Sequence, residues 1–180
     1  RDLLLALVPS ISSDQSQEFA RRLIERLATI EGEDASKLRI EIELGGELTA
    51  MLISGEIEPV RERLEALSHG PHASLVQADP SFVLLQATLA TYEENFEEAL
   101  SLLEPYCRGE HGIANVHGVE NEVFNKMLRR LGEVYHYSGE LDDALASLDE
   151  AGRLALSIGS SYDYAWASYS RAAVLVDTDH

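Results

Sequence analysis

Ser138-Gly-Glu-Leu-Asp-Asp-Ala144 decides the fold, because two other segments of the chain align with it without a gap. These are Ser54-Gly-Glu-Ile-Glu-Pro-Val60 and Glu93-Glu-Asn-Phe-Glu-Glu-Ala99. Each segment combines a turn residue, an apolar anchor, acidic side chains and a small residue that opens a helix. Carboxylates near a helix N-terminus are stabilised by the unpaired amides and the helix dipole. Each segment therefore predicts a tight turn between two antiparallel helices.

Apolar residues recur with the helical period on both sides of these turns, and no run alternates over enough residues to indicate a strand. The third turn follows Val123, Met127, Leu128, Leu131, Val134 and Tyr135, and it precedes Leu141, Ala144, Leu145, Leu148 and Ala151. The pattern predicts an all-α chain with helices at 14–31, 34–53, 56–69, 80–93, 96–108, 119–137, 140–158 and 162–176. Pro105 should kink or end its helix near Glu104. A surface loop is expected at 108–118.

We expect one helical-repeat domain over residues 1–180, cut from a longer protein. Its predicted parts are N-terminal helices at 1–32, hairpins at 34–70, 80–108 and 119–158, and a partial repeat at 162–176. The absence of an initial methionine and an apolar pattern that stops soon after it begins both favour a fragment. Repeat arrays normally cover their terminal face. An uncovered apolar face on the last helix, with Trp166, Tyr169, Ala172 and Val176, therefore predicts either self-association through this face or a tail that folds back over it.

The third hairpin resembles the tetratricopeptide repeat, whose pattern is a large residue, Leu-Gly, Tyr, Ala, a large residue and Ala. These positions are Leu128, Leu131-Gly132, Tyr135, Ala144, Leu148 and Ala151. The resemblance implies a right-handed superhelix, or solenoid, of antiparallel helix hairpins. The longer first helices and loops are similar to the helical-repeat domain of the maltose-operon-activator type of large bacterial transcription regulators. That second likeness implies a sensing or docking role within a regulator.

Ligands of the tetratricopeptide family lie in a concave groove that the first helix of each hairpin lines. The resemblance places this groove at Lys126, Arg129, Glu133 and His136, and then at Trp166 and Tyr169. The first four recur at three- and four-residue steps, so they form one stripe on a helix. Because an Arg guanidinium can fork onto a carboxylate, the stripe predicts a peptide tail or an acidic side chain as the ligand. The alternative is an ordinary solvated face, with the two aromatic residues packed against a neighbour.

The composition, 45% hydrophobic and 26% charged, is typical of a soluble domain with a sizeable core. A formal net charge of −18 opposes binding to nucleic acid and to anionic membranes. The longest aliphatic run, Leu3 to Val8, is too short to cross a bilayer. Cys107 is the only cysteine, which excludes an internal disulfide and a thiolate cluster and fits a cytoplasmic location.

Motifs for catalysis are absent from the sequence: there is no Gly-rich phosphate loop, no Gly-x-Ser-x-Gly elbow and no His-Glu-x-x-His helix. The pairs His69/His72 and His111/His117 lack the cysteines or spaced carboxylates that would complete a tetrahedral metal site. The sequence thus predicts a protein- or peptide-binding module rather than an enzyme, with no cofactor and no metal. Two alternatives stay open. One is a small-molecule effector-sensing domain, which needs an enclosed apolar pocket, and the other is a hydrolase or metal enzyme.

Overall fold

The computed structural model describes residues 13–30, 32–108 and 119–178, and over these residues all regular structure is helical. The all-α prediction is therefore confirmed for this part of the chain. Within it, no helix is both long enough and apolar enough to cross a membrane. The contacts divide the chain into two compact units, Arg1–Leu85 and Gln86–His180, and the boundary falls inside α7 (Pro80–Tyr92). A single continuous domain stays a prediction, and nearly all of the predicted loop at 108–118 lies outside the described residues.

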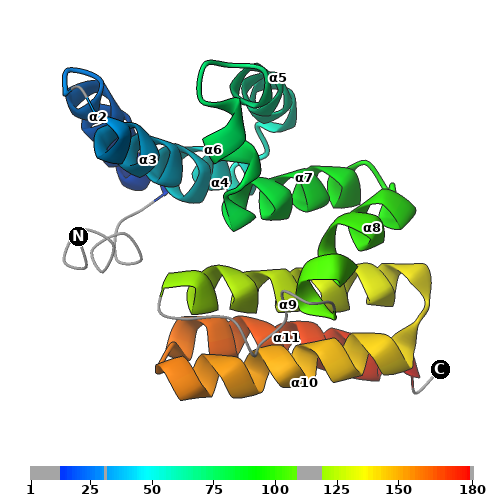
Figure 1. Cartoon of the computed structure of the whole chain (residues 1–180). Coiled ribbons are helices and arrows are strands. Elements are labelled where there is room, and N and C mark those ends of the chain that lie inside the picture. Colours follow the sequence, from blue (N-terminus) through cyan, green and yellow to red (C-terminus); the bar gives the residue numbers. More distant parts are fainter. Residues whose placement is uncertain (1–12, 31, 109–118, 179–180) are drawn as a thin grey trace. The chain divides into compact units, whose positions relative to one another are not determined.

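The first unit contains α2 (Ser13–Leu27), α3 (Glu33–Ile42), η2 (Glu43–Leu48), α4 (Thr49–Ile53), α5 (Ile57–Ser68) and α6 (Ala73–Gln77) (Figure 1). Its apolar core includes Leu44, Leu48, Leu52, Val60, Leu64 and Val76. The short helix α6 was not predicted, because its five residues are too few for a helical period to be recognised. The helix predicted at 14–31 ends at Leu27 instead.

The helix predicted at 34–53 is one helical run, but its middle segment, η2, winds as a π-helix. The hydroxyl of Thr49 donates to the carbonyl of Leu44, five residues earlier, at 2.9 Å. Gly46 allows close packing there, since a Cβ on it would lie 3.6 Å from the Cβ of Ala20 on α2. The buried Glu43 carboxylate pairs with Arg63 of α5 at 2.5 Å. The ion pair thereby connects the π-helical segment to α5.

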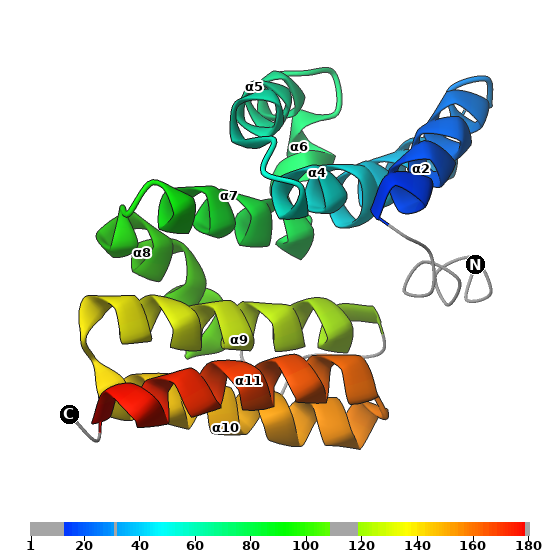
Figure 2. The same cartoon turned by 180° about the vertical axis from the view of Figure 1, so that it is seen from behind.

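The second unit contains the end of α7, then α8 (Phe96–Cys107), α9 (Val119–Ser138), α10 (Leu141–Ile158) and α11 (Ser161–Thr178). Figures 1 and 2 show α9, α10 and α11 side by side and successively antiparallel. Their shared core is built from Met127, Leu131, Val134, Ala144, Leu148, Ala151, Ala167 and Val174. The helices observed at 119–138, 141–158 and 161–178 match the predicted ones to within two residues.

The three aligned turn segments adopt the same backbone geometry. The second residue of each has positive φ: 87° at Gly55, 59° at Glu94 and 81° at Gly139. Left-handed backbone is nearly free for glycine and costs other residues about 1–2 kcal/mol. The middle turn therefore carries a strained residue where its two relatives have glycine.

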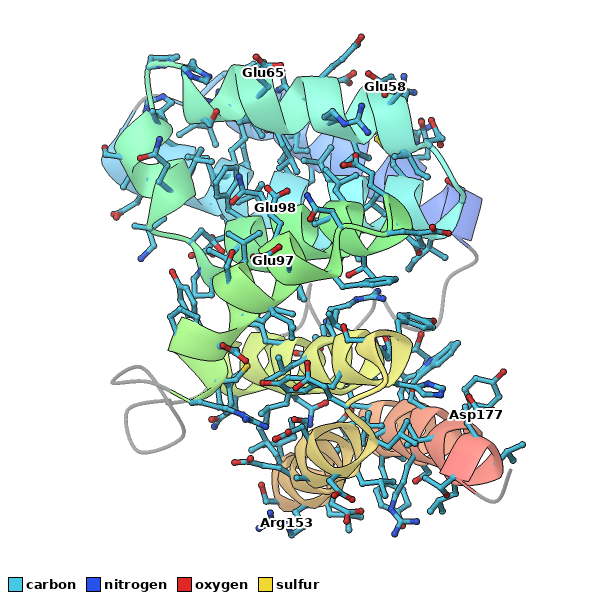
Figure 3. The ribbon with its side chains drawn as sticks, turned by 90° about the vertical axis from the view of Figure 1, so that its right-hand side faces the viewer. Glu58, Glu65, Glu97, Glu98, Arg153 and Asp177 are labelled. Carbon is cyan, nitrogen blue, oxygen red and sulfur yellow. The ribbon has the colours of Figure 1, made fainter. Side chains whose placement is uncertain are left out.

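The residue after the left-handed position, Glu56, Asn95 or Glu140, closes the preceding helix and stands at the N-cap of the next one. Its amide donates to a carbonyl of the preceding helix five residues earlier, at 2.9, 2.8 and 2.8 Å respectively. Acidic side chains then fill the first helical turn, among them Glu58, Glu97 and Glu98 (Figure 3). The last residue of each segment is fully buried: Val60, Ala99 and Ala144. The predicted tight turns are thus confirmed at all three positions, and the helices on either side of the third turn, α9 and α10, also pack side by side.

The sequence predicted a helix start at Asp79-Pro80 and a helix kink or end near Pro105, and the two predictions have different outcomes. The Asp79 side chain accepts from the amide of Ser81 at 2.8 Å, and α7 begins at Pro80, as the pair predicts. Of the two outcomes predicted at Pro105, a helix end near Glu104 is wrong, because α8 continues to Cys107, and a kink stays a prediction. A proline three residues from a helix end removes only one hydrogen bond, and the Arg108 amide still donates to the Glu104 carbonyl at 2.8 Å.

Candidate functional site

The stripe on α9 meets α11 along one side of the second unit. The Arg129 guanidinium lies 5.8 Å from the centre of the Trp166 ring. The Ser170 hydroxyl donates to Glu133 at 3.0 Å. These contacts bring two parts of the predicted groove together, although they are far apart in sequence. We call this region the α9–α11 surface and define it by Arg129, Glu133, His136, Tyr162, Trp166 and Tyr169.

His136 lies at one end of the α9–α11 surface, next to the C-terminal end of α11. Its Nε2 lies 2.6 Å from the carboxylate of Asp177, which Figure 3 labels. The His136 ring also stacks on Tyr137, whose ring in turn stacks on Phe96 of α8, each at 5.8 Å between centroids. His136 is thus held from α11 and from its own helix, which fixes the orientation of its ring.

Three aromatic side chains of α11 make up the exposed part of the surface. Tyr162, Trp166 and Tyr169 are 59%, 42% and 70% exposed. Neighbouring rings meet edge to face at 6.3 and 5.9 Å, a geometry that aromatic rings favour. Together with Ala165 they line an open hollow of about 450 Å³. The predicted exposed apolar face of this helix is confirmed, and it also includes Val176.

The cations of the stripe already have partners within the chain. Glu133 pairs with Arg129 at 2.5 Å and with Arg130 at 2.8 Å. These three side chains are only 14–20% exposed, so water screens the pairs less than it screens surface pairs. A ligand carboxylate at Arg129 would therefore have to compete with Glu133. Lys126 pairs with Glu122 of its own helix at 3.5 Å, and its part in the groove stays a prediction.

Some residues of this surface were not foreseen in the sequence. Tyr162 was detectable, because with Trp166 and Tyr169 it forms a set at four- and three-residue steps, which share one helix face. Ser170 and Asp177 gave no such signal. Their role depends on which side of α11 packs against α9, and a helical period does not specify that side.

A second polar cluster joins α8, α9 and α10. The Tyr135 hydroxyl donates to Glu104 at 2.5 Å, and the Arg108 guanidinium lies 4.8 Å from the Tyr135 ring centre. Arg108 also pairs with Asp143 at 2.7 Å. Burial, and then the hydrogen bond to Glu104, raise the pKa of Tyr135 well above its usual range. The hydroxyl therefore stays protonated at neutral pH, where it serves as a fixed donor in the packing of three helices.

The described residues that could act as nucleophiles or metal ligands include Cys107 and His69. Burial, and then the nearby Glu150 carboxylate, raise the pKa of the Cys107 thiol to about 12, opposite to the shift that activates a thiol. Among the residues that the structure describes, no three His, Cys, Asp or Glu side chains gather as a metal site would require. His111 and His117 lie outside those residues, while His69 bonds to the carbonyl of Glu65.

Comparisons of the chain with protein families, with curated proteins and with solved structures found no match. What the α9–α11 surface can bind therefore has to be inferred from its own residues.

Proposed function

We propose that this chain is a protein- or peptide-binding helical-repeat module whose partner docks on the α9–α11 surface. The observation that carries the proposal is the exposed row of Tyr162, Trp166 and Tyr169. Tyrosine and tryptophan supply most of the binding energy in many protein interfaces, because they bury a large area and have few rotatable bonds. A row of three on one helix face offers a partner a continuous apolar contact.

The surface is also held in place before any partner binds. Arg129 is fixed by Glu133 and lies beside Trp166, while Glu133 accepts from Ser170. Side chains that are already ordered lose less conformational entropy on association, which favours affinity. This arrangement supports a recognition surface over a face that is merely solvated.

A tetratricopeptide-like solenoid is the architecture that we propose for this module. Support comes from the three equivalent turns and from the close approach of α9 and α10 at Gly132, where a Cβ would lie 2.6 Å from Leu148 Cγ. A sensing or docking role in a cytoplasmic bacterial transcription regulator is the wider setting that the resemblance of the third hairpin suggests. Burial raises the pKa of Cys107 to about 12, so at neutral pH this side chain is a thiol and not the thiolate that a nucleophile requires.

The small-molecule sensor is a second candidate that one observation favours. The hollow of about 450 Å³ falls within the size range of ligand pockets. However, its lining residues, Tyr162, Ala165, Trp166 and Tyr169, all come from one helix, and it is open to solvent. A pocket that buries most of a small ligand needs walls from several elements, so an extended partner fits this geometry better.

The proposal can be tested by selecting peptides against the whole chain and measuring their binding by calorimetry. Tyr169→Ala should weaken the selected peptides about tenfold, as expected for an aromatic residue in a contact centre. Tyr164→Ala is the matched control, since Tyr164 is a 42% exposed tyrosine of the same helix that does not line the hollow. Equal binding to both variants would move the docking site away from the α9–α11 surface.

A further inference from the structure

We infer that the partner segment is basic, and that the hollow between Tyr162, Trp166 and Tyr169 takes a lysine or arginine side chain of that segment. This inference rests on the proposed function and names the chemistry of its partner. The hollow has three aromatic walls and the small Ala165 between them. Aromatic faces attract cations through their quadrupole, and several rings around one site strengthen the attraction.

The residues that line the hollow carry no charge. On the α9 side, Arg129 and Arg130 both pair with the carboxylate of Glu133, so neither cation is unpaired. The charge of the whole chain, −18, sets the sign of the long-range field, and this field attracts a cation and repels an anion.

The contact between Arg129 and Trp166 shows that this aromatic wall accepts a guanidinium. The Arg129 guanidinium lies 5.8 Å from the Trp166 ring centre while it is paired with Glu133. A cation brought by a partner would use the remaining ring surfaces, since all three rings are at least 42% exposed. An incoming carboxylate would have to share the neighbouring Arg129 guanidinium with Glu133, which already accepts from its Nη1.

Arg129→Gln separates the two partner chemistries, because it should change their binding in opposite directions. Removing this cation frees ring surface and makes the field more negative, so a basic segment should bind about two- to fivefold more tightly, the range of one exposed cation–π contact. A carboxylate ligand would lose its guanidinium and bind more weakly. Glu133 keeps Arg130 as its partner in the variant, so no unpaired buried carboxylate results.

The test uses the whole chain and three heptapeptides that carry lysine, glutamate or norleucine at alternate positions. Trp166 is the only tryptophan, so its fluorescence reports on the hollow directly. We expect the lysine peptide to bind most tightly, and to lose affinity from low to physiological salt as screening increases. Tyr162→Ala and Tyr169→Ala should each weaken it about threefold or more, the scale of an exposed cation–π contact. Tyr164→Ala should leave its Kd unchanged. Far-UV circular dichroism checks that each variant is folded.

Several results would overturn the inference. Stronger binding of the glutamate or norleucine peptide, no detectable binding of the lysine peptide, or binding that is indifferent to Tyr162 and Tyr169 would each exclude a basic partner at the hollow. Weaker binding of the lysine peptide to Arg129→Gln would do the same. If selected peptides are acidic or neutral and still depend on Tyr169, the proposed function stands and only its partner chemistry is wrong.

Discussion

Gly132 on α9 offers the sharpest test of how the second unit packs. A Cβ built on Gly132 would lie 2.6 Å from Leu148 Cγ, 3.0 Å from Leu148 Cδ2 and 3.1 Å from the carbonyl oxygen of Ala144. Leu148 is 1% exposed and Ala144 is fully buried, so neither can move away without disturbing the core. Neither contact atom can rotate aside as the end of a flexible side chain could, because the Ala144 oxygen belongs to the backbone and Leu148 Cγ is the branch point of its side chain. The substitution Gly132→Ala should therefore force α9 and α10 apart.

The expected cost of Gly132→Ala is the difference between two effects of opposite sign. Overpacking a core typically costs about 1–3 kcal/mol. Replacing glycine by alanine inside a helix raises the free energy of unfolding by about 1 kcal/mol, because alanine has the higher helix propensity. Because the shortest contact lies below any normal carbon–carbon separation, we expect the steric effect to be larger and the free energy of unfolding to fall by up to about 2 kcal/mol.

Gly152→Ala on α10 is the matched control, with the opposite expected sign. The nearest atoms to its added Cβ are ring carbons of Tyr164 at 3.9 Å, which is ordinary van der Waals contact. Only the gain in helix propensity remains, so stability should rise by about 0.5–1 kcal/mol. Urea unfolding followed by Trp166 fluorescence reports on the second unit, because this sole tryptophan lies in α11. Equal stabilisation by both substitutions would refute the close approach at Gly132.

Three further outcomes are expected. Glu94→Gly should stabilise the chain by about 0.5–1 kcal/mol, because the residue at 94 has φ of 59° and its two counterparts are glycines; a loss of stability in thermal melts would contradict this. The Cys107 pKa is raised from about 9 to about 12, so the unfolded chain loses this proton first and stability should fall as pH rises above about 9. Cys107→Ala should flatten that fall, and an unchanged slope would exclude the thiol as its cause. Arg63→Met should cost about 1–3 kcal/mol, since it leaves Glu43 buried without its cation; a neutral effect on the urea midpoint would mean that Glu43 is solvated.

The sequence was informative wherever a feature depends on neighbouring residues. Apolar residues at the helical period and the Asp79-Pro80 pair located α7, α9, α10 and α11 to within two residues. The three ungapped turn segments predicted tight turns between helices, and the structure shows that the second residue of each has left-handed backbone. Helical period, capping and turn chemistry are local properties, and they act within a few residues of the position that they determine.

Features that depend on distant residues needed the tertiary structure. The helical spacing placed Arg129 and Glu133 on one stripe, but the sequence did not show that Glu133 also pairs with Arg130 and accepts from Ser170. It likewise did not show that Trp166 would lie beside Arg129. Such contacts follow from the angle and rotation at which two helices pack. These are set by the shapes of many buried side chains together, so no local pattern encodes them.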